Sequence, residues 1–205
     1  ITCTTVLLTD DVASAPHEEH DKRRGVAGMV YAFKTAGAVA EEGRDLDTVT
    51  AVAQKTADSC RSIGVALSPC TVPQAGKPTF EIADDEIEMG MGIHGEPGIW
   101  RGKLRTADEI ATEMMERLLA DMPLSGGDKV SVMVNSLGAS PPEELYILYN
   151  KVKAALEASG ASIVMPLVGR YATSMEMAGV SFTICNLDDE LETLLKACLL
   201  YTSPS

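Results

Sequence analysis

The residues best suited to chemistry lie in one run, Glu86 to Gly98, where an alternating apolar pattern gives way to glycines around a single histidine. The alternation of Ile87, Met89 and Met91 predicts a strand, and glycines at its end let a ligand approach closely. His94 would therefore stand at the edge of a sheet, where α/β domains form ligand crevices. Its imidazole is readily neutral and nucleophilic near pH 7. From the residues alone, His94 is otherwise an ordinary turn residue.

Hydrophobic periodicity predicts strands and helices on both sides of this run. Besides the strand that leads to His94, the predicted strands are 4–8, 63–67, 129–134, 161–168 and 180–187. The predicted helices are 25–42, 46–61, one that begins at Thr106, 141–158 and 190–197. Because these helices are too few to cover both faces of so many strands, we expect an α/β fold with a mixed sheet and helices mainly on one face.

The composition excludes several classes of protein. A net charge of −13 disfavours a nucleic-acid partner, because phosphate binding requires clustered Lys and Arg. From the sequence given, we expect neither a signal peptide nor a membrane-spanning segment, because the first residues carry no basic run and no apolar stretch is long enough to span a bilayer. His17 and His20 lack a third ligand nearby, so we expect no metal site. The five cysteines form no short paired motif, which predicts a reduced, cytoplasmic protein: Cys3, Cys60, Cys70, Cys185 and Cys198.

One strand–turn segment suggests a phosphate site but lacks its chemistry. At Asn135 to Ser140, glycine and hydroxyl residues precede a predicted helix. The segment has neither the spacing nor the lysine of a nucleotide P-loop, and the chain has no G-x-S-x-G elbow or kinase catalytic loop. If the chain takes part in phosphoryl transfer, the nucleotide is expected on another module.

A series of motifs then runs along the chain in a fixed order: Thr9-Asp10-Asp11-Val12-Ala13, Arg23-Arg24-Gly25-Val26-Ala27, Ser62-Ile63-Gly64-Val65-Ala66-Leu67, Cys70-Thr71-Val72-Pro73, Ala75-Gly76-Lys77-Pro78, Gly92-Ile93-His94-Gly95-Glu96-Pro97-Gly98, Val134-Asn135-Ser136-Leu137-Gly138-Ala139 and Glu144-Leu145-Tyr146. This series resembles the substrate-binding component of the dihydroxyacetone (glycerone) kinase family. The resemblance covers nearly everything from Ile1 to Ala197, and the run around the histidine is its most specific part.

The resemblance implies a glycerone kinase-type phosphotransferase in which His94 attacks the carbonyl carbon of dihydroxyacetone and forms a covalent hemiaminal. A triose has few groups for non-covalent binding, so a reversible bond would hold its hydroxyl in place for transfer. Gly92 and Gly95 would keep the approach clear of side chains. Glu96 would either orient the imidazole or cap the turn, and the residues leave both roles open.

The resemblance also implies partners for the reaction. The chain itself would bind no cofactor. The phosphoryl donor, ATP or an ADP-carrying subunit, would belong to a nucleotide-binding kinase subunit or to a fused domain, and the sequence does not decide between them. The full-length protein is expected to be a homodimer.

The implied architecture is DAK1/DegV-like, with two α/β domains. Residues 1–61 would be the C-terminal remnant of the first α/β/α domain, and 62–197 the second domain, which carries the covalent histidine. The family's acid/base aspartate, second active-site histidine and glycine-rich loop lie upstream of the position that matches Ile1. We therefore expect a fragment with little or no kinase turnover of its own. Residues 198–205 resemble a translated sequencing adapter and are expected to be an artefact.

Two other functions stay open at this point. A transcriptional co-regulator that senses dihydroxyacetone on the same fold could keep the histidine, so His94 alone does not separate it from a kinase. A fatty-acid-binding protein of related architecture is disfavoured, because a lipid site has no use for a nucleophile at His94.

Overall fold

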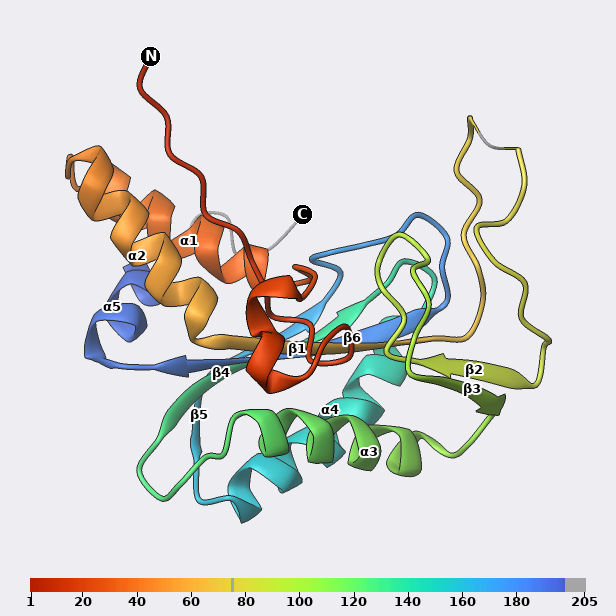
Figure 1. Ribbon diagram of the computed structural model, residues 1–205. Coiled ribbons are helices and arrows are strands. Elements are labelled where there is room, and N and C mark those ends of the chain that lie inside the picture. Colours follow the sequence, from red (N-terminus) through yellow and green to blue (C-terminus); the bar gives the residue numbers. More distant parts are fainter. Residues whose placement is uncertain (75, 198–205) are drawn as a thin grey trace.

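The computed structural model describes residues 1–74 and 76–197, and its strands form a six-stranded sheet in the order β3-β2-β1-β6-β4-β5 (Figure 1). Strands β4 and β5 are parallel, and the other neighbours are antiparallel. The predicted mixed α/β sheet is therefore confirmed. The strands are β1 Cys60–Ala66, β2 Glu86–Met89, β3 Trp100–Lys103, β4 Lys129–Ser136, β5 Ser162–Gly169 and β6 Gly179–Leu187.

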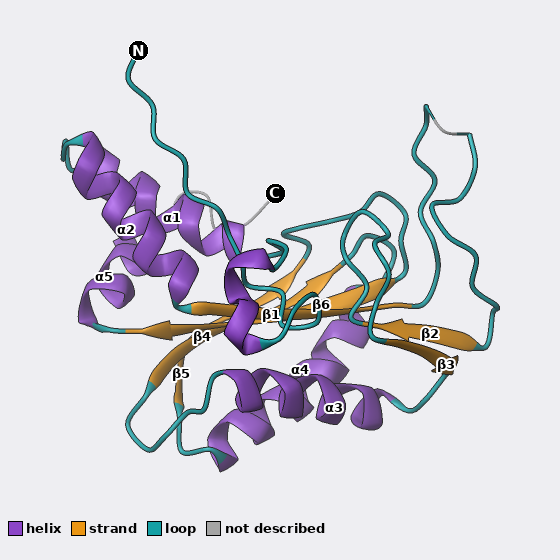
Figure 2. Cartoon of the chain, in the orientation of Figure 1, coloured by secondary structure: helices purple, strands orange, loops and turns teal. Residues whose placement is uncertain are grey.

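Helices lie on both faces of this sheet, as Figure 2 shows. They are α1 Gly28–Glu41, α2 Leu46–Asp58, α3 Ala107–Asp121, α4 Pro142–Ala158 and α5 Asp189–Ala197, with a short 3-10 helix at His17–Lys22. The helices α3 and α4 cover one face, and α1, α2 and α5 cover the other. The expectation of helices mainly on one face therefore does not hold for the whole sheet, although two of the three helices in 62–197, α3 and α4, share a face. Among the described residues, none of these helices is both long and apolar enough to cross a membrane.

The central strand β6 explains why both faces are covered. Its alternate residues Phe182 and Ile184 belong to the core under α3 and α4, whereas Cys185 belongs to the core under α1, α2 and α5. All three are fully buried. Successive side chains of a strand point to opposite faces, so a strand that is buried at nearly every position requires cover on both sides.

The strand predicted at 4–8 is wrong. Residues 4–8 make no ladder, and the nearest pairing is a single parallel bridge between Asp11 and Ser62. Apolar side chains there suit a strand, but a strand forms only where a partner accepts its backbone hydrogen bonds. Strand β3 shows the opposite error: Trp100–Lys103 carries no apolar alternation, yet it pairs with β2 because the loop between them folds back.

Two predicted boundaries have different outcomes. The division between 61 and 62 falls inside β1, and the partition into two domains stays a prediction. The proposed artefact at 198–205 lies outside the described residues.

Candidate functional site

The candidate site is the loop of residues 90–98, here called the His94 loop, which leaves β2 and returns to β3 (Figure 1). Two backbone bonds close it onto the sheet. The Gly90 N–H donates to the Gly64 carbonyl at 2.7 Å, and the Ile99 N–H donates to the Met89 carbonyl at 2.7 Å. The loop therefore begins and ends on ordered strand backbone, which fixes where its tip can lie.

A tight turn forms the tip of the His94 loop. The Gly95 N–H donates to the Gly92 carbonyl at 3.0 Å, which places Ile93 and His94 at the two central positions. Gly95 has a φ of +85°, a left-handed conformation that favours glycine. The His94 side chain is 80% exposed, whereas Met91 in the stem is buried. The turn therefore presents the imidazole to solvent on a packed stem.

Glu96 holds both the turn and the imidazole. Its Oε2 accepts a hydrogen bond from the His94 backbone N–H at 3.0 Å, and its Oε1 lies 3.3 Å from His94 Nδ1. Burial raises the pKa of Glu96, but the N–H groups of Glu96 and His94 and the charges of His94 and Arg24 outweigh it, so the pKa is lowered. An ionised carboxylate at Nδ1 favours the tautomer with its proton on that nitrogen, which leaves a lone pair on Nε2 of this largely exposed side chain.

The two predicted glycines lie in close packing. A Cβ built on Gly92 would lie 2.2 Å from Glu96 Oε2, and one built on Gly95 would lie 3.0 Å from the Thr79 side chain. Gly92 is buried, so its missing side chain makes room for the Glu96 carboxylate. The structure thus brings together all four residues that the sequence singled out, and their roles toward a substrate stay predictions.

Two further residues support the loop and received no role from the sequence. Arg24 donates from Nη2 to the Gly90 carbonyl at 3.1 Å and from Nη1 to the Pro97 carbonyl at 3.5 Å. Its Nε donates to Asp11 Oδ2 at 2.9 Å. Both residues belong to motifs of the series that resembles the kinase family. No local spacing links them to the loop, because Gly90 and Pro97 lie 66 and 73 residues after Arg24 in the chain.

A comparison with known families decides where the chain belongs. The Dak1 domain matches residues 1–201. The chain belongs to the Dak1 family. The Dak1 chain is 48% identical over 191 residues to the PTS-dependent dihydroxyacetone kinase 2, dihydroxyacetone-binding subunit DhaK, of Listeria innocua, with 93% of this chain and 57% of that protein covered. It is 43% identical to the L-erythrulose kinase of Pectobacterium atrosepticum, with 96% and 34% covered. The resemblance to the substrate-binding component of dihydroxyacetone kinases is confirmed.

Solved structures agree with this assignment. The dihydroxyacetone kinase operon co-activator Dha-DhaQ superposes with a TM-score of 0.84 at 32% identity and covers 94% of the Dak1 chain and 59% of its own. A DegV lipid-binding protein of Thermotoga maritima superposes with a TM-score of 0.56 at 14% identity over 78% of this chain and 56% of its own, a likeness of fold alone. The predicted DAK1/DegV-like fold is confirmed. The Dak1 chain spans about half the length of the curated dihydroxyacetone-binding relatives it matches.

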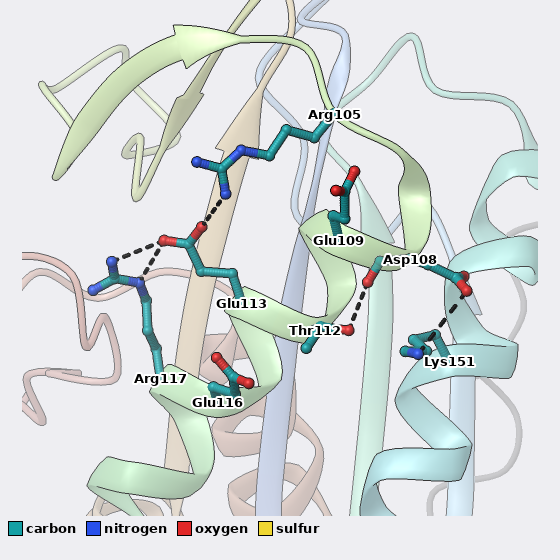
Figure 3. A pocket seen from close by; sticks show the side chains of 8 residues that line it. All are labelled: Arg105, Asp108, Glu109, Thr112, Glu113, Glu116, Arg117 and Lys151. Carbon is teal, nitrogen blue, oxygen red and sulfur yellow. Dashed lines mark hydrogen bonds and ion pairs between the residues drawn. The ribbon is translucent and has the colours of Figure 1, made fainter.

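A separate groove on the Dak1 chain offers less chemistry than the His94 loop. It runs along α3, with a volume of about 590 Å³, and none of the predicted site residues lines it. Its basic side chains are all paired with acids of the same groove: Glu113 pairs with Arg105 at 3.0 Å and with Arg117 at 2.8 Å, and Asp108 lies 3.9 Å from Lys151 (Figure 3). The lining residues are Arg105, Asp108, Glu109, Thr112, Glu113, Glu116, Arg117 and Lys151. Within the described residues, no group of three or more His, Cys, Asp or Glu side chains is placed to hold a metal ion.

The packing at Gly92 gives a first testable prediction. Gly92→Ala is expected to destabilise the Dak1 chain by about 1–3 kcal/mol, the usual cost of overpacking, because the new methyl group overlaps the Glu96 carboxylate. Gly37→Ala is the control, since Gly37 lies exposed in α1 with nothing within 4 Å of its Cβ position. It should gain up to about 1 kcal/mol of helix stability. Urea unfolding measures both, and a Gly92→Ala chain as stable as the parent would contradict the packing argument.

Proposed function

We propose that the Dak1 chain holds dihydroxyacetone as a covalent hemiaminal on His94, so that the triose can be phosphorylated to dihydroxyacetone phosphate. The observation that carries the proposal is the exposed imidazole with an ionised carboxylate at Nδ1, at the tip of a loop fixed to the sheet. Sequence similarity to a dihydroxyacetone-binding subunit supports dihydroxyacetone as the ligand. Gly92, Gly95 and Glu96 would shape the turn around the bound substrate.

The proposed step is an addition that balances without any co-reactant. The Nε2 lone pair attacks the carbonyl carbon, the N–C bond forms as the C=O π bond opens, and the carbonyl oxygen takes up a proton. The imidazole then releases its Nδ1 proton, for which Glu96 Oε1 at 3.3 Å or water is the acceptor. A carboxylate at Nδ1 also stabilises the transient imidazolium, which makes Nε2 the stronger nucleophile.

Covalent binding also accounts for selectivity. A three-carbon ketose has few polar groups, and small ligands gain limited free energy per heavy atom. A bond to the carbonyl carbon selects ketoses over glycerol, which has no carbonyl to attack. Kinship with an L-erythrulose kinase is consistent with a four-carbon ketose at the same site.

We propose that the phosphoryl donor lies on another subunit or domain. The donor is either ATP, bound by that subunit or domain, or a separate subunit that carries ADP. This chain would supply the substrate, and the whole protein would act as a homodimer. Of the described carboxylates, Glu96 is the one in contact with His94. Because its Oε2 accepts the His94 N–H of the turn, we do not assign it the role of the base that activates the substrate hydroxyl. We therefore expect little or no phosphoryl transfer from this chain alone. Measurable kinase turnover by the purified chain would contradict that expectation.

A second candidate is a co-regulator that binds dihydroxyacetone as a signal. It is favoured by the superposition with the operon co-activator at a TM-score of 0.84. Both candidates use the same adduct on His94, and they differ in whether the bound triose is consumed. Incubation of the full-length protein with dihydroxyacetone and a nucleotide-binding kinase subunit would separate them, with ATP as the donor in one arm and an ADP-carrying subunit recharged by a phosphotransferase system in the other. A sensor returns the triose unphosphorylated in both arms.

Carbon NMR tests the proposed function directly. With dihydroxyacetone labelled with ¹³C at its carbonyl carbon, we expect a tetrahedral-carbon signal that diffuses with the protein and disappears on dialysis. Glycerol labelled at its central carbon should give no protein-bound signal. A folded protein that shows free ketose and no co-diffusing tetrahedral carbon would overturn the proposal.

A further inference from the structure

We infer that Arg24, seated on Asp11, is a positioning residue for His94: a single guanidinium joins the two ends of the His94 loop and thereby fixes the imidazole. This inference rests on the proposed function, which it deepens. Among the described residues, the Arg24 guanidinium bonds to Asp11, Gly90 and Pro97 and not to the imidazole, so it would act on the reaction through the loop and through Glu96.

The contacts of Arg24 span the loop from beginning to end. Nη2 donates to the carbonyl of Gly90, where the loop begins, and Nη1 donates to the carbonyl of Pro97, next to its last residue. Between them, Nη1 lies 3.0 Å from the Cβ position of Gly92. The guanidinium therefore packs under the turn and fixes the distance between the two arms of the loop, at Gly90 and Pro97.

The anchor beneath Arg24 is rigid. The Asp11 side chain is 1% exposed, and its Oδ2 receives Arg24 Nε at 2.9 Å and Nη2 at 2.8 Å. The backbones are also tied, since the Asp11 N–H donates to the Arg24 carbonyl at 3.1 Å. Burial raises the pKa of Asp11 to about 6 although the Arg24 charge lowers it, so the buried carboxylate depends on that partner.

Only arginine suits this arrangement. Its planar fork carries five N–H donors and can serve Asp11, Gly90 and Pro97 at once, whereas a lysine ammonium is a point charge. The positive charge of Arg24 also contributes to the lowered pKa of Glu96, the carboxylate at His94 Nδ1. Loss of the guanidinium would loosen the turn and weaken the ionised form of Glu96 together.

The test compares Arg24→Gln and Arg24→Lys with Arg61→Gln in the full-length protein. Arg61 is a matched control because its Nε donates to Asp121 Oδ1 at 2.6 Å, with side chains 17% and 8% exposed. Among the described residues, its other hydrogen bonds go to the Asp58 and Cys60 carbonyls and not to the His94 loop. Two readouts are taken: amide hydrogen exchange of residues 90–98, and the dissociation constant of the dihydroxyacetone adduct from the ¹³C signal.

We expect Arg24→Gln to speed exchange in the His94 loop and to weaken the adduct by about tenfold or more, the loss of one charge-assisted hydrogen bond. Arg24→Lys keeps the positive charge, so its melting temperature should be close to that of the parent. The affinity of its adduct should lie between those of the parent and of Arg24→Gln. Arg61→Gln should leave both readouts at the parent values, even if it destabilises the protein as much as Arg24→Gln does.

Two results would overturn the inference: parent-like exchange and adduct affinity in Arg24→Gln, or the same losses in Arg61→Gln. The failure of the proposed function has a different signature. If the parent protein forms no adduct while Arg24→Gln still speeds exchange of residues 90–98 alone, Arg24 positions the loop and the covalent role of His94 is wrong.

Discussion

His94→Ala is expected to bring the dihydroxyacetone adduct below detection while leaving the fold intact. The proposed bond is made by an imidazole nitrogen, and alanine supplies no nucleophile in its place. Because the His94 side chain is 80% exposed, its removal should change the free energy of unfolding by no more than about 0.5 kcal/mol. The ¹³C measurement and a urea unfolding curve on the same preparation would show both effects.

A second histidine provides the control for this substitution. His20 is exposed in the short 3-10 helix and lies outside the His94 loop. His20→Ala should keep the adduct at the parent level. An adduct that survives in His94→Ala, or that disappears in His20→Ala, would show that the covalent bond forms elsewhere.

Asp10→Ala is expected to cause the largest loss of stability, more than about 3 kcal/mol. The Asp10 carboxylate is completely buried and accepts from the Val26 N–H at 3.0 Å, from the Gly28 N–H at 2.9 Å and from the Ser62 hydroxyl. Alanine would leave the Val26 and Gly28 N–H groups without their partner in the interior, whereas the Ser62 hydroxyl keeps its hydrogen bond with Thr183. A buried unsatisfied donor costs about 1–3 kcal/mol. The carboxylate also sits at the N-terminus of α1, where a negative charge is favourable.

Asp45 gives the matched comparison, because it caps α2 in the same chemical way at an exposed position. Its side chain accepts from the Thr48 N–H at 2.9 Å. Asp45→Ala should cost about 1 kcal/mol, the usual value for an N-cap. Urea unfolding of the two variants measures the difference, which is attributable to burial. An Asp10→Ala chain no less stable than Asp45→Ala would show that the interior donors find other partners.

Local patterns determined the elements that position the site. The capping box at Thr106 and Glu109 begins α3 where the sequence predicted it, and Asp45 caps α2. The strand before His94 and the glycine turn around it also follow from spacing over a few residues. These features were predictable because propensity, capping and turn chemistry act between near neighbours in the chain.

Tertiary contacts decided the remaining parts of the fold. The apolar run at 4–8 has the composition of a strand but no partner, and Trp100–Lys103 becomes β3 only because the His94 loop brings it back to β2. Pairing joins distant segments, so composition cannot reveal it.

The same distinction holds within the site. The sequence alone determined that His94 would lie on a glycine turn after a strand, and that Gly92, Gly95 and Glu96 would surround it. Only the tertiary structure decided that Glu96 both caps the turn and contacts Nδ1, since the two roles require one carboxylate to reach two nitrogens at once. It alone placed Arg24 and Asp11 beneath the loop, because their contacts cross from the N-terminal segment to the end of β2, and no spacing rule extends that far.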